Sequence, residues 1–161
     1  MINCINSTNL IGKNMKKVLA IASGGGHWKQ LMLLKPAYDS QTVKYVTTIK
    51  GLPEQNNINN FAIVCDSNKN EKLRAIYSFI QMIVIFIRFW PDVVITTGAA
   101  PGLLGLILGK LCFKKTIWVD SVANAEQLSL CGKISKKFAD VVLTQWEQLA
   151  DDSTQYKGSV F

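Results

Sequence analysis

The glycine loop at residues 23–27 constrains the fold more than any other part of this sequence. It follows a short apolar run at 18–22 and leads into a helix-like stretch. Glycines let a backbone turn tightly and approach a ligand closely, and the free N–H groups at a helix start favour an anion. This order predicts an α/β fold with a binding site at Ser23, Gly24, Gly25, Gly26 and His27.

His27 is the only histidine in the chain. Histidine is the side-chain type that exchanges a proton most readily near neutral pH, so we predict a catalytic role for it. The alternative is a histidine that only completes the helix start. The loop lacks the third glycine of the dinucleotide fingerprint, and the phosphate-loop motif GxxxxGK[ST] is absent.

Apolar, β-branched runs alternate with helical stretches along the rest of the chain. The predicted strands are 17–22, 43–48, 61–65, 92–97, 116–119 and 141–145. The predicted helices are 27–36, 70–90, 102–112, 127–138 and a short one near 146–151, while 51–60 reads as a loop. This alternation is typical of a Rossmann-like parallel sheet with helices on both faces. We predict one such domain over 15–161, preceded by a disordered extension at 1–14.

Two further strands end in small or polar residues. The strand at 92–97 leads into Thr97, Gly98, Ala99 and Ala100, and the strand at 116–119 leads into Asp120 and Ser121. The carboxyl ends of parallel strands form the ligand crevice of an open α/β sheet. We therefore expect these residues beside the glycine loop. For Asp120 two roles stay open, orienting His27 or a substrate hydroxyl, or capping a helix.

The net charge of +7 favours anionic partners, namely phosphorylated substrates, lipid headgroups or nucleic acid. Nucleic acid is the weakest of these, because the basic residues come in small pairs without an RNA-binding motif or zinc spacing, and we predict none. No metal site or cofactor is predicted. Four separated cysteines without a CxxC motif favour buried free thiols in a reducing compartment, and no cleaved targeting signal is recognised.

The stretch 73–90 is apolar on nearly every side. One interpretation is a helix buried against the sheet, and the other is a helix with one face in a membrane interface. Its uninterrupted apolar part, 83–87, is far shorter than the ~20 residues that span a bilayer, so an interfacial position is the alternative to burial. The predicted membrane-surface residues are Arg74, Phe79, Met82, Phe86, Arg88 and Phe89. The segment 103–113, with nearby lysines, extends that surface.

Three segments together resemble one known family. They are the SGGGH loop, the WPDVVITTGAAPG strand and loop, and the segment from Trp118 to Trp146. They resemble the acceptor-side, membrane-associating subunit of split lipid-linked sugar transferases, which includes the anchoring subunit of the dolichol-linked N-acetylglucosaminyltransferase. The similarity runs from about Lys16 to Phe161, and residues 156–159 resemble the last strand of the family.

The resemblance implies the N-terminal half of a GT-B glycosyltransferase, located peripherally on the cytoplasmic face of the cell membrane. Such a subunit binds a polyprenyl-diphosphate-linked sugar acceptor and recruits a separate donor-binding subunit. His27 would be a general base for the acceptor hydroxyl. Relatives often carry Glu-Ser and a nearby arginine where this chain has Asp120-Ser121 and Asn124. Two alternatives stay open, a non-catalytic scaffold that activates its partner and an unrelated nucleotide-binding enzyme.

Overall fold

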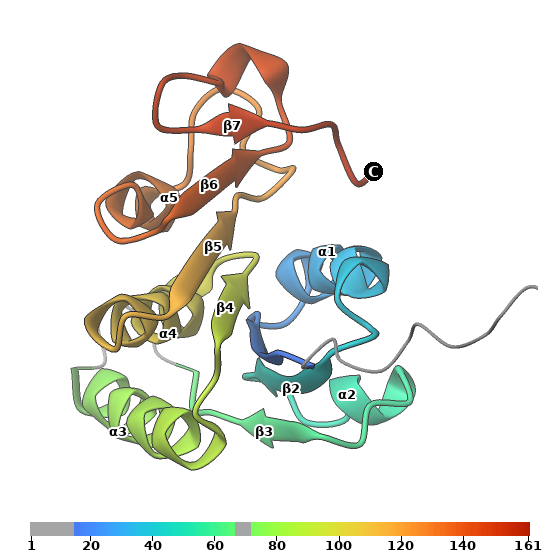
Figure 1. Cartoon of the computed structure of the whole chain (residues 1–161), viewed down its shortest axis with the longest axis vertical. Coiled ribbons are helices and arrows are strands. Elements are labelled where there is room, and N and C mark those ends of the chain that lie inside the picture. The colour runs from blue at the N-terminus through green and yellow to red at the C-terminus, as the bar shows by residue number, and fades with distance from the viewer. Residues whose placement is uncertain (1–14, 67–71) are drawn as a thin grey trace, which may run out of the picture.

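The computed structural model describes residues 15–66 and 72–161, so the predicted extension at 1–14 lies outside the described residues. The described strands form one parallel sheet in the order β3-β2-β1-β4-β5-β6-β7 (Figure 1). They are β1 (Lys17–Ile21), β2 (Thr42–Thr47), β3 (Phe61–Ile63), β4 (Val93–Thr96), β5 (Lys115–Val119), β6 (Val141–Thr144) and β7 (Gln155–Tyr156). The direction of strand addition reverses between β1 and β4, and open α/β sheets bind ligands at such a switch point.

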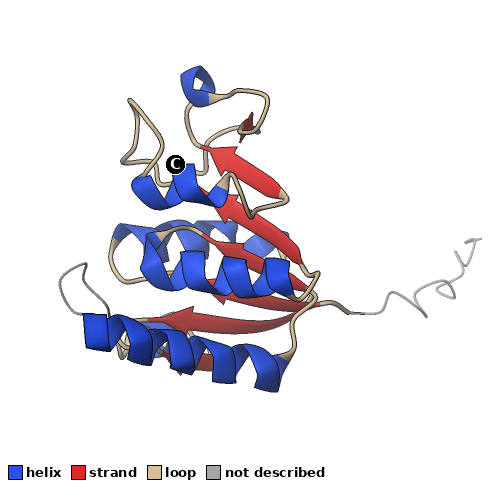
Figure 2. Cartoon of the chain, turned by 90° about the vertical axis from the view of Figure 1, so that its left-hand side faces the viewer, coloured by secondary structure: helices blue, strands red, loops and turns tan. Residues whose placement is uncertain are grey.

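Helices cover both faces of this sheet, as the sequence predicted. The α-helices are α1 (Gly26–Leu34), α2 (Leu52–Gln55), α3 (Lys72–Phe89), α4 (Ala99–Leu111) and α5 (Leu130–Ser135), with 3₁₀ turns η1 (Lys35–Ala37) and η2 (Glu147–Leu149). Helices α3, α4 and α5 lie side by side on one face, while α1 and α2 cover the other (Figures 1 and 2). The Rossmann-like architecture follows from this arrangement.

The central strand β1 is buried on both faces, which explains its continuous apolar sequence. Val18 and Ala20 belong to a core cluster shared with α1, and Leu19 and Ile21 belong to a second cluster shared with α3. A third cluster joins α4 to β5 and β6 around Trp118, which is fully buried. The sheet therefore holds its carboxyl edge in a fixed position between two helical layers.

Several boundaries differ from the sequence prediction. The stretch 51–60 contains the short helix α2, and α4 begins at Ala99, three residues before the predicted start. Helix α5 covers only the middle of 127–138, and the last strand includes Tyr156 but not 157–159. Helix α3 stops at Phe89 because Trp90 has a left-handed backbone (φ 48°) and a proline follows it.

Helix α3 has one face on the sheet and one open face, and this corrects part of the predicted membrane surface. Met82 and Phe86 are 0% and 2% exposed. They lie one helical turn apart on the side that packs against β1, β2 and β4, so they are core residues. Arg74, Phe79 and Arg88 are exposed and Phe89 is half-buried.

An apolar row runs along the open face of α3. Its members, each at least 41% exposed, are Leu73, Ile76, Tyr77, Ile80, Val84 and Ile87. Within residues 15–66 and 72–161, no helix combines the length and apolarity needed to cross a bilayer. Two of the cysteines, Cys65 and Cys112, are half-buried free thiols rather than fully buried ones.

Candidate functional site

The glycine loop leaves the start of α1 open. Gly25 has a left-handed backbone (φ 65°), and no described side chain caps the helix that begins at Gly26. Gly25 and Gly26 are exposed, and a Cβ added to either would meet no atom within 4 Å. A Cβ at Gly24 would collide with Ile49, so that glycine is needed for packing against the segment after β2. The first-turn amides of α1 are therefore accessible to an anion.

The loop after β4 also leads into a helix whose start has no side-chain cap within the described residues. Helix α4 begins directly after Gly98, no side chain among the described residues caps it, and its first turn contains no acidic residue. Ala99 has φ 66°, a left-handed conformation that costs a non-glycine residue about 1–3 kcal/mol. Because β1 and β4 are neighbours, two uncapped helix starts lie at the same edge of the sheet.

His27 joins these two loops. Its Nδ1 lies 2.9 Å from the carbonyl oxygen of Thr97, and the Thr97 hydroxyl donates to the His27 carbonyl oxygen over 2.7 Å. The imidazole lies against Gly98, where an added Cβ would be 2.5 Å from Cε1 and 2.6 Å from Nδ1. The ring is therefore fixed by one hydrogen bond and by a surface that only glycine leaves free.

The hydrogen bond to Thr97 determines which nitrogen of His27 carries the proton. A carbonyl oxygen only accepts, so Nδ1 must donate. In the neutral ring Nε2 then has a free lone pair, the arrangement that a general base requires. Thr97 itself is fully buried, and its hydroxyl is engaged with His27. Its role in this structure is to position the histidine.

Asp120 does not fit the predicted role as an acceptor-binding residue. It is 1% exposed, and its carboxylate accepts hydrogen bonds from Trp118, Asn124 and both donors of Ser129. Ser129 is the N-cap of α5. Asp120 therefore does not cap a helix itself, but holds the cap residue Ser129 in place. Ser121 is half-buried, and its hydroxyl oxygen accepts from the Ala123 amide.

Gln30 is a site residue that the sequence reasoning missed. It is fully buried on α1, where its amide donates to the Asp120 carbonyl over 2.7 Å and accepts from the Val122 amide over 3.3 Å. Gln30 thus connects the loop that follows β5, which is the third loop of the site, to the helix that carries His27. The sequence feature that could have identified Gln30 is its position as a polar residue on the face of α1 that the apolar pattern predicts to be buried.

The three strand-end loops therefore meet at one edge of the sheet, as predicted. His27 and Thr97 connect the first two, and Gln30 connects the third. In residues 15–66 and 72–161 there is no group of three or more histidine, cysteine, aspartate or glutamate side chains that could hold a metal ion.

Solved structures share this fold. The chain superposes on MurG from Acinetobacter baumannii with a TM-score of 0.73 and 13% identity, covering 88% of this chain and 45% of that one. A UDP-N-acetylglucosamine 2-epimerase from Rickettsia bellii gives a TM-score of 0.69 and 18% identity, covering 91% and 46%. This chain thus corresponds to about half of each structure, and the prediction of a GT-B-type Rossmann-like domain is confirmed.

Curated sequences are similar as well. The UDP-N-acetylglucosamine transferase subunit alg14 of Schizosaccharomyces pombe is 26% identical over 174 residues, covering 88% of this chain and 80% of that protein. The corresponding subunit of Mus musculus is 34% identical over 93 residues, covering 53% and 41%.

A family model described as "Oligosaccharide biosynthesis protein Alg14 like" matches residues 57–160. The match includes the second and third loops and begins after the glycine loop. Because it spans well over half of the sequence, the chain belongs to the Alg14-like family of oligosaccharide biosynthesis proteins, a family of glycosyltransferase subunits.

Proposed function

We propose that this chain is the acceptor-binding subunit of a two-component glycosyltransferase, acting in capsule, exopolysaccharide or lipid-linked oligosaccharide synthesis. It binds a polyprenyl-diphosphate-linked sugar at the membrane, and a separate donor-binding subunit supplies the nucleotide sugar. The main support for this proposal is the position of His27. Its Nε2 is left available by the bond at Nδ1 and lies at the switch point beside two uncapped helix starts. The relatives' names as transferase subunits support the same reading.

The two helix starts suit the acceptor diphosphate. Each contributes the positive end of a helix dipole and free amides, and neither first turn carries an acidic residue. Gly25 and Gly26 leave space for phosphate oxygens at α1. The loop 97–100 contributes the amides of Ala99 and Ala100. Binding the diphosphate there would bring the attached sugar to the side of the site where His27 lies.

His27 then acts as the general base. Its Nε2 takes the proton from the acceptor hydroxyl while that oxygen attacks the anomeric carbon of the donor sugar. The anomeric carbon–oxygen bond breaks, and the electron pair leaves with the nucleoside diphosphate. The Thr97 carbonyl keeps Nδ1–H in place and stabilises the positive charge that forms on the ring. A positioned base of this kind contributes about 10²–10⁴-fold.

Peripheral attachment at the cytoplasmic face of the membrane fits the open face of α3. The apolar row from Leu73 to Ile87 is flanked by Arg74 and Arg88, both exposed. An apolar strip with flanking cations is the pattern of a helix that lies in a lipid interface. This position would keep the site near the lipid-linked substrate.

The experiment is transfer by the reconstituted pair of subunits, with His27→Asn as the variant. The asparagine amide can still donate to the Thr97 carbonyl, but it has no basic nitrogen. We expect kcat to fall by about 10²-fold or more. Unchanged transfer would refute the catalytic role and leave the scaffold function. Tight nucleotide-sugar binding by the isolated chain would instead favour a nucleotide-binding enzyme.

A further inference from the structure

Helices α3 and α4 end in the same unusual way. In α4 the Phe113 amide bonds to the Lys110 carbonyl and the Lys114 amide bonds to the Gly109 carbonyl, which is a Schellman motif with Phe113 at C′. In α3 the Trp90 amide bonds to the Phe86 carbonyl. Trp90 and Phe113 have φ values of 48° and 56°. This C′ position is usually glycine, because a Cβ is strained there.

Neither aromatic side chain is fully buried, so burial of the ring does not offset the backbone strain. Phe113 is 97% exposed and Trp90 is 51% exposed. The two helices pack against each other, and the Lys114 ammonium lies 4.7 Å from the centre of the Trp90 ring. Two strained, exposed aromatic residues therefore lie at one end of the helical layer, near the end of the apolar row of α3.

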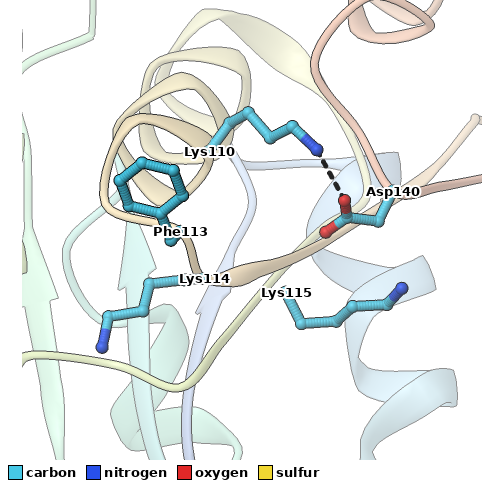
Figure 3. A pocket seen from close by; sticks show the side chains of 5 residues that line it. All are labelled: Lys110, Phe113, Lys114, Lys115 and Asp140. Atoms are coloured by element: carbon cyan, nitrogen blue, oxygen red, sulfur yellow. Dashed lines mark hydrogen bonds and ion pairs between the residues drawn. The ribbon is translucent and has the colours of Figure 1, made fainter.

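Three lysines lie near Phe113, and one of them, Lys114, also reaches the Trp90 ring. A pocket of about 470 Å³ is lined by Lys110, Phe113, Lys114, Lys115 and Asp140 (Figure 3). Lys110 is paired with Asp140 over 2.7 Å. Burial raises the pKa of Asp140, but hydrogen bonds from Lys110 and Thr116 outweigh this and bring the pKa below its usual value. Asp140 therefore neutralises one lysine, and the other two supply a net positive charge.

The remaining two lysines do not converge on one point. Figure 3 shows the Lys114 and Lys115 side chains pointing away from one another. A single small anion cannot bridge diverging ammonium groups, whereas a lipid surface offers a separate headgroup to each. Aromatic residues at the interface and cations at the headgroups are the usual anchors of membrane-associated segments.

We propose that these helix ends form a second membrane contact, the aromatic rim, made of Trp90, Phe113, Lys114 and Lys115. The two aromatic rings enter the lipid interface, and the lysines bind the phosphate groups of anionic phospholipids. The rim rests on the proposed membrane association and names the chemistry of one part of it. Together with the apolar row it fixes how α3 lies on the bilayer.

The test is partitioning of the full chain onto vesicles of phosphatidylcholine mixed with phosphatidylglycerol, at low salt. Phe113→Gly removes the ring and the backbone strain. We expect it to bind about tenfold more weakly while its Tm rises, so a folding defect cannot explain the loss. Phe113→Ala keeps the strain, and we expect equally weak binding without the rise in Tm.

The charge arm uses matched double variants. Lys114→Ala with Lys115→Ala should weaken binding by about fivefold for each lysine, and the difference should shrink at high salt. Lys29→Ala with Lys157→Ala changes the net charge equally at exposed positions on α1 and after β7, and we expect almost no loss. Equal losses in both double variants would overturn the rim, as would displacement from vesicles by soluble glycerol phosphate.

A last comparison separates this proposal from the proposed function. If Ile80→Asp abolishes vesicle binding while Phe113→Gly binds as the wild type does, the rim is wrong and membrane association by α3 stands. Transfer to a detergent-solubilised acceptor by the reconstituted pair tests the glycosyltransferase function without any bilayer.

Discussion

Gly98→Ala tests whether the position of His27 matters for transfer. An alanine Cβ at residue 98 would lie 2.5 Å from Cε1 of the imidazole, whereas ordinary contact begins near 3.4 Å. The ring must therefore retreat by about 0.9 Å. That movement breaks or stretches the 2.9 Å bond from Nδ1 to the Thr97 carbonyl and shifts Nε2 away from the acceptor.

The expected cost to transfer is large compared with the cost to folding. A misplacement of about 1 Å at a catalytic group lowers the rate by about 10²-fold. The backbone at Gly98 has φ 138°, so alanine also destabilises the fold by about 1–3 kcal/mol. Gly158→Ala is the matched control, because Gly158 also has a positive φ (96°) but no atom lies within 4 Å of an added Cβ.

The assay is kcat/KM of the reconstituted pair, with Tm measured for each variant. Gly98→Ala should lower kcat/KM by the roughly 10²-fold expected for a displaced base. Gly158→Ala should keep the kcat/KM of the wild type, although its Tm falls by a similar amount. In the His27→Asn background, Gly98→Ala should have little further effect, because both changes act through one side chain. A Gly98→Ala variant whose kcat/KM stays within about threefold of the wild type would refute this reasoning.

Four further variants test the roles of buried and exposed residues. Asp120→Ala should lower the free energy of unfolding by about 3 kcal/mol in urea denaturation, because it leaves the donors of Trp118 and Ser129 unpaired; a loss of activity at unchanged stability would contradict this. Met82→Ala should cost about 2–5 kcal/mol as a core cavity, whereas Ile80→Ala, 52% exposed, should cost under about 1 kcal/mol; equal losses would mean that α3 is buried on both sides. The Asp140 pKa is lowered in the folded state, so its contribution to stability is complete above the ordinary value of 3.8 and is lost as the pH falls below it. Asp140→Asn should remove that part of the acid dependence of Tm, and an unchanged acid profile would show that the carboxylate contributes nothing.

Much of the architecture could be predicted from the sequence because it rests on local patterns. The unbroken apolar runs identified every central strand, since both faces of a parallel sheet are buried. The glycine loop, the segment 97–100 and the pair Asp120-Ser121 identified the three loops at the carboxyl edge. The predicted helix boundaries were less accurate. The start of α4 at Ala99 was missed because nothing in the sequence indicates that an alanine adopts a left-handed conformation.

The roles of individual polar residues were harder to predict, because they depend on partners distant in sequence. Asp120 follows a strand as a ligand-binding carboxylate would, but in the folded chain Trp118, Asn124 and Ser129 occupy its oxygens. In the sequence Gln30 has no feature that identifies its hydrogen-bond partner. Its bond to the Asp120 carbonyl forms only because α1 packs beside the third loop. Periodicity likewise left the orientation of α3 open, since its apolar residues surround the helix.

The sequence by itself therefore determined the Rossmann-like fold, the edge of the sheet that carries the site, and His27 as its one histidine. These follow from composition and spacing along the chain. Only the tertiary structure decided that Thr97 fixes the proton on Nδ1, that Met82 and Phe86 face the sheet, and that Trp90 and Phe113 follow the ends of two helices that pack against each other. The physical reason is that a hydrogen bond or a packed face depends on which distant segments meet, and that is fixed only when the sheet assembles.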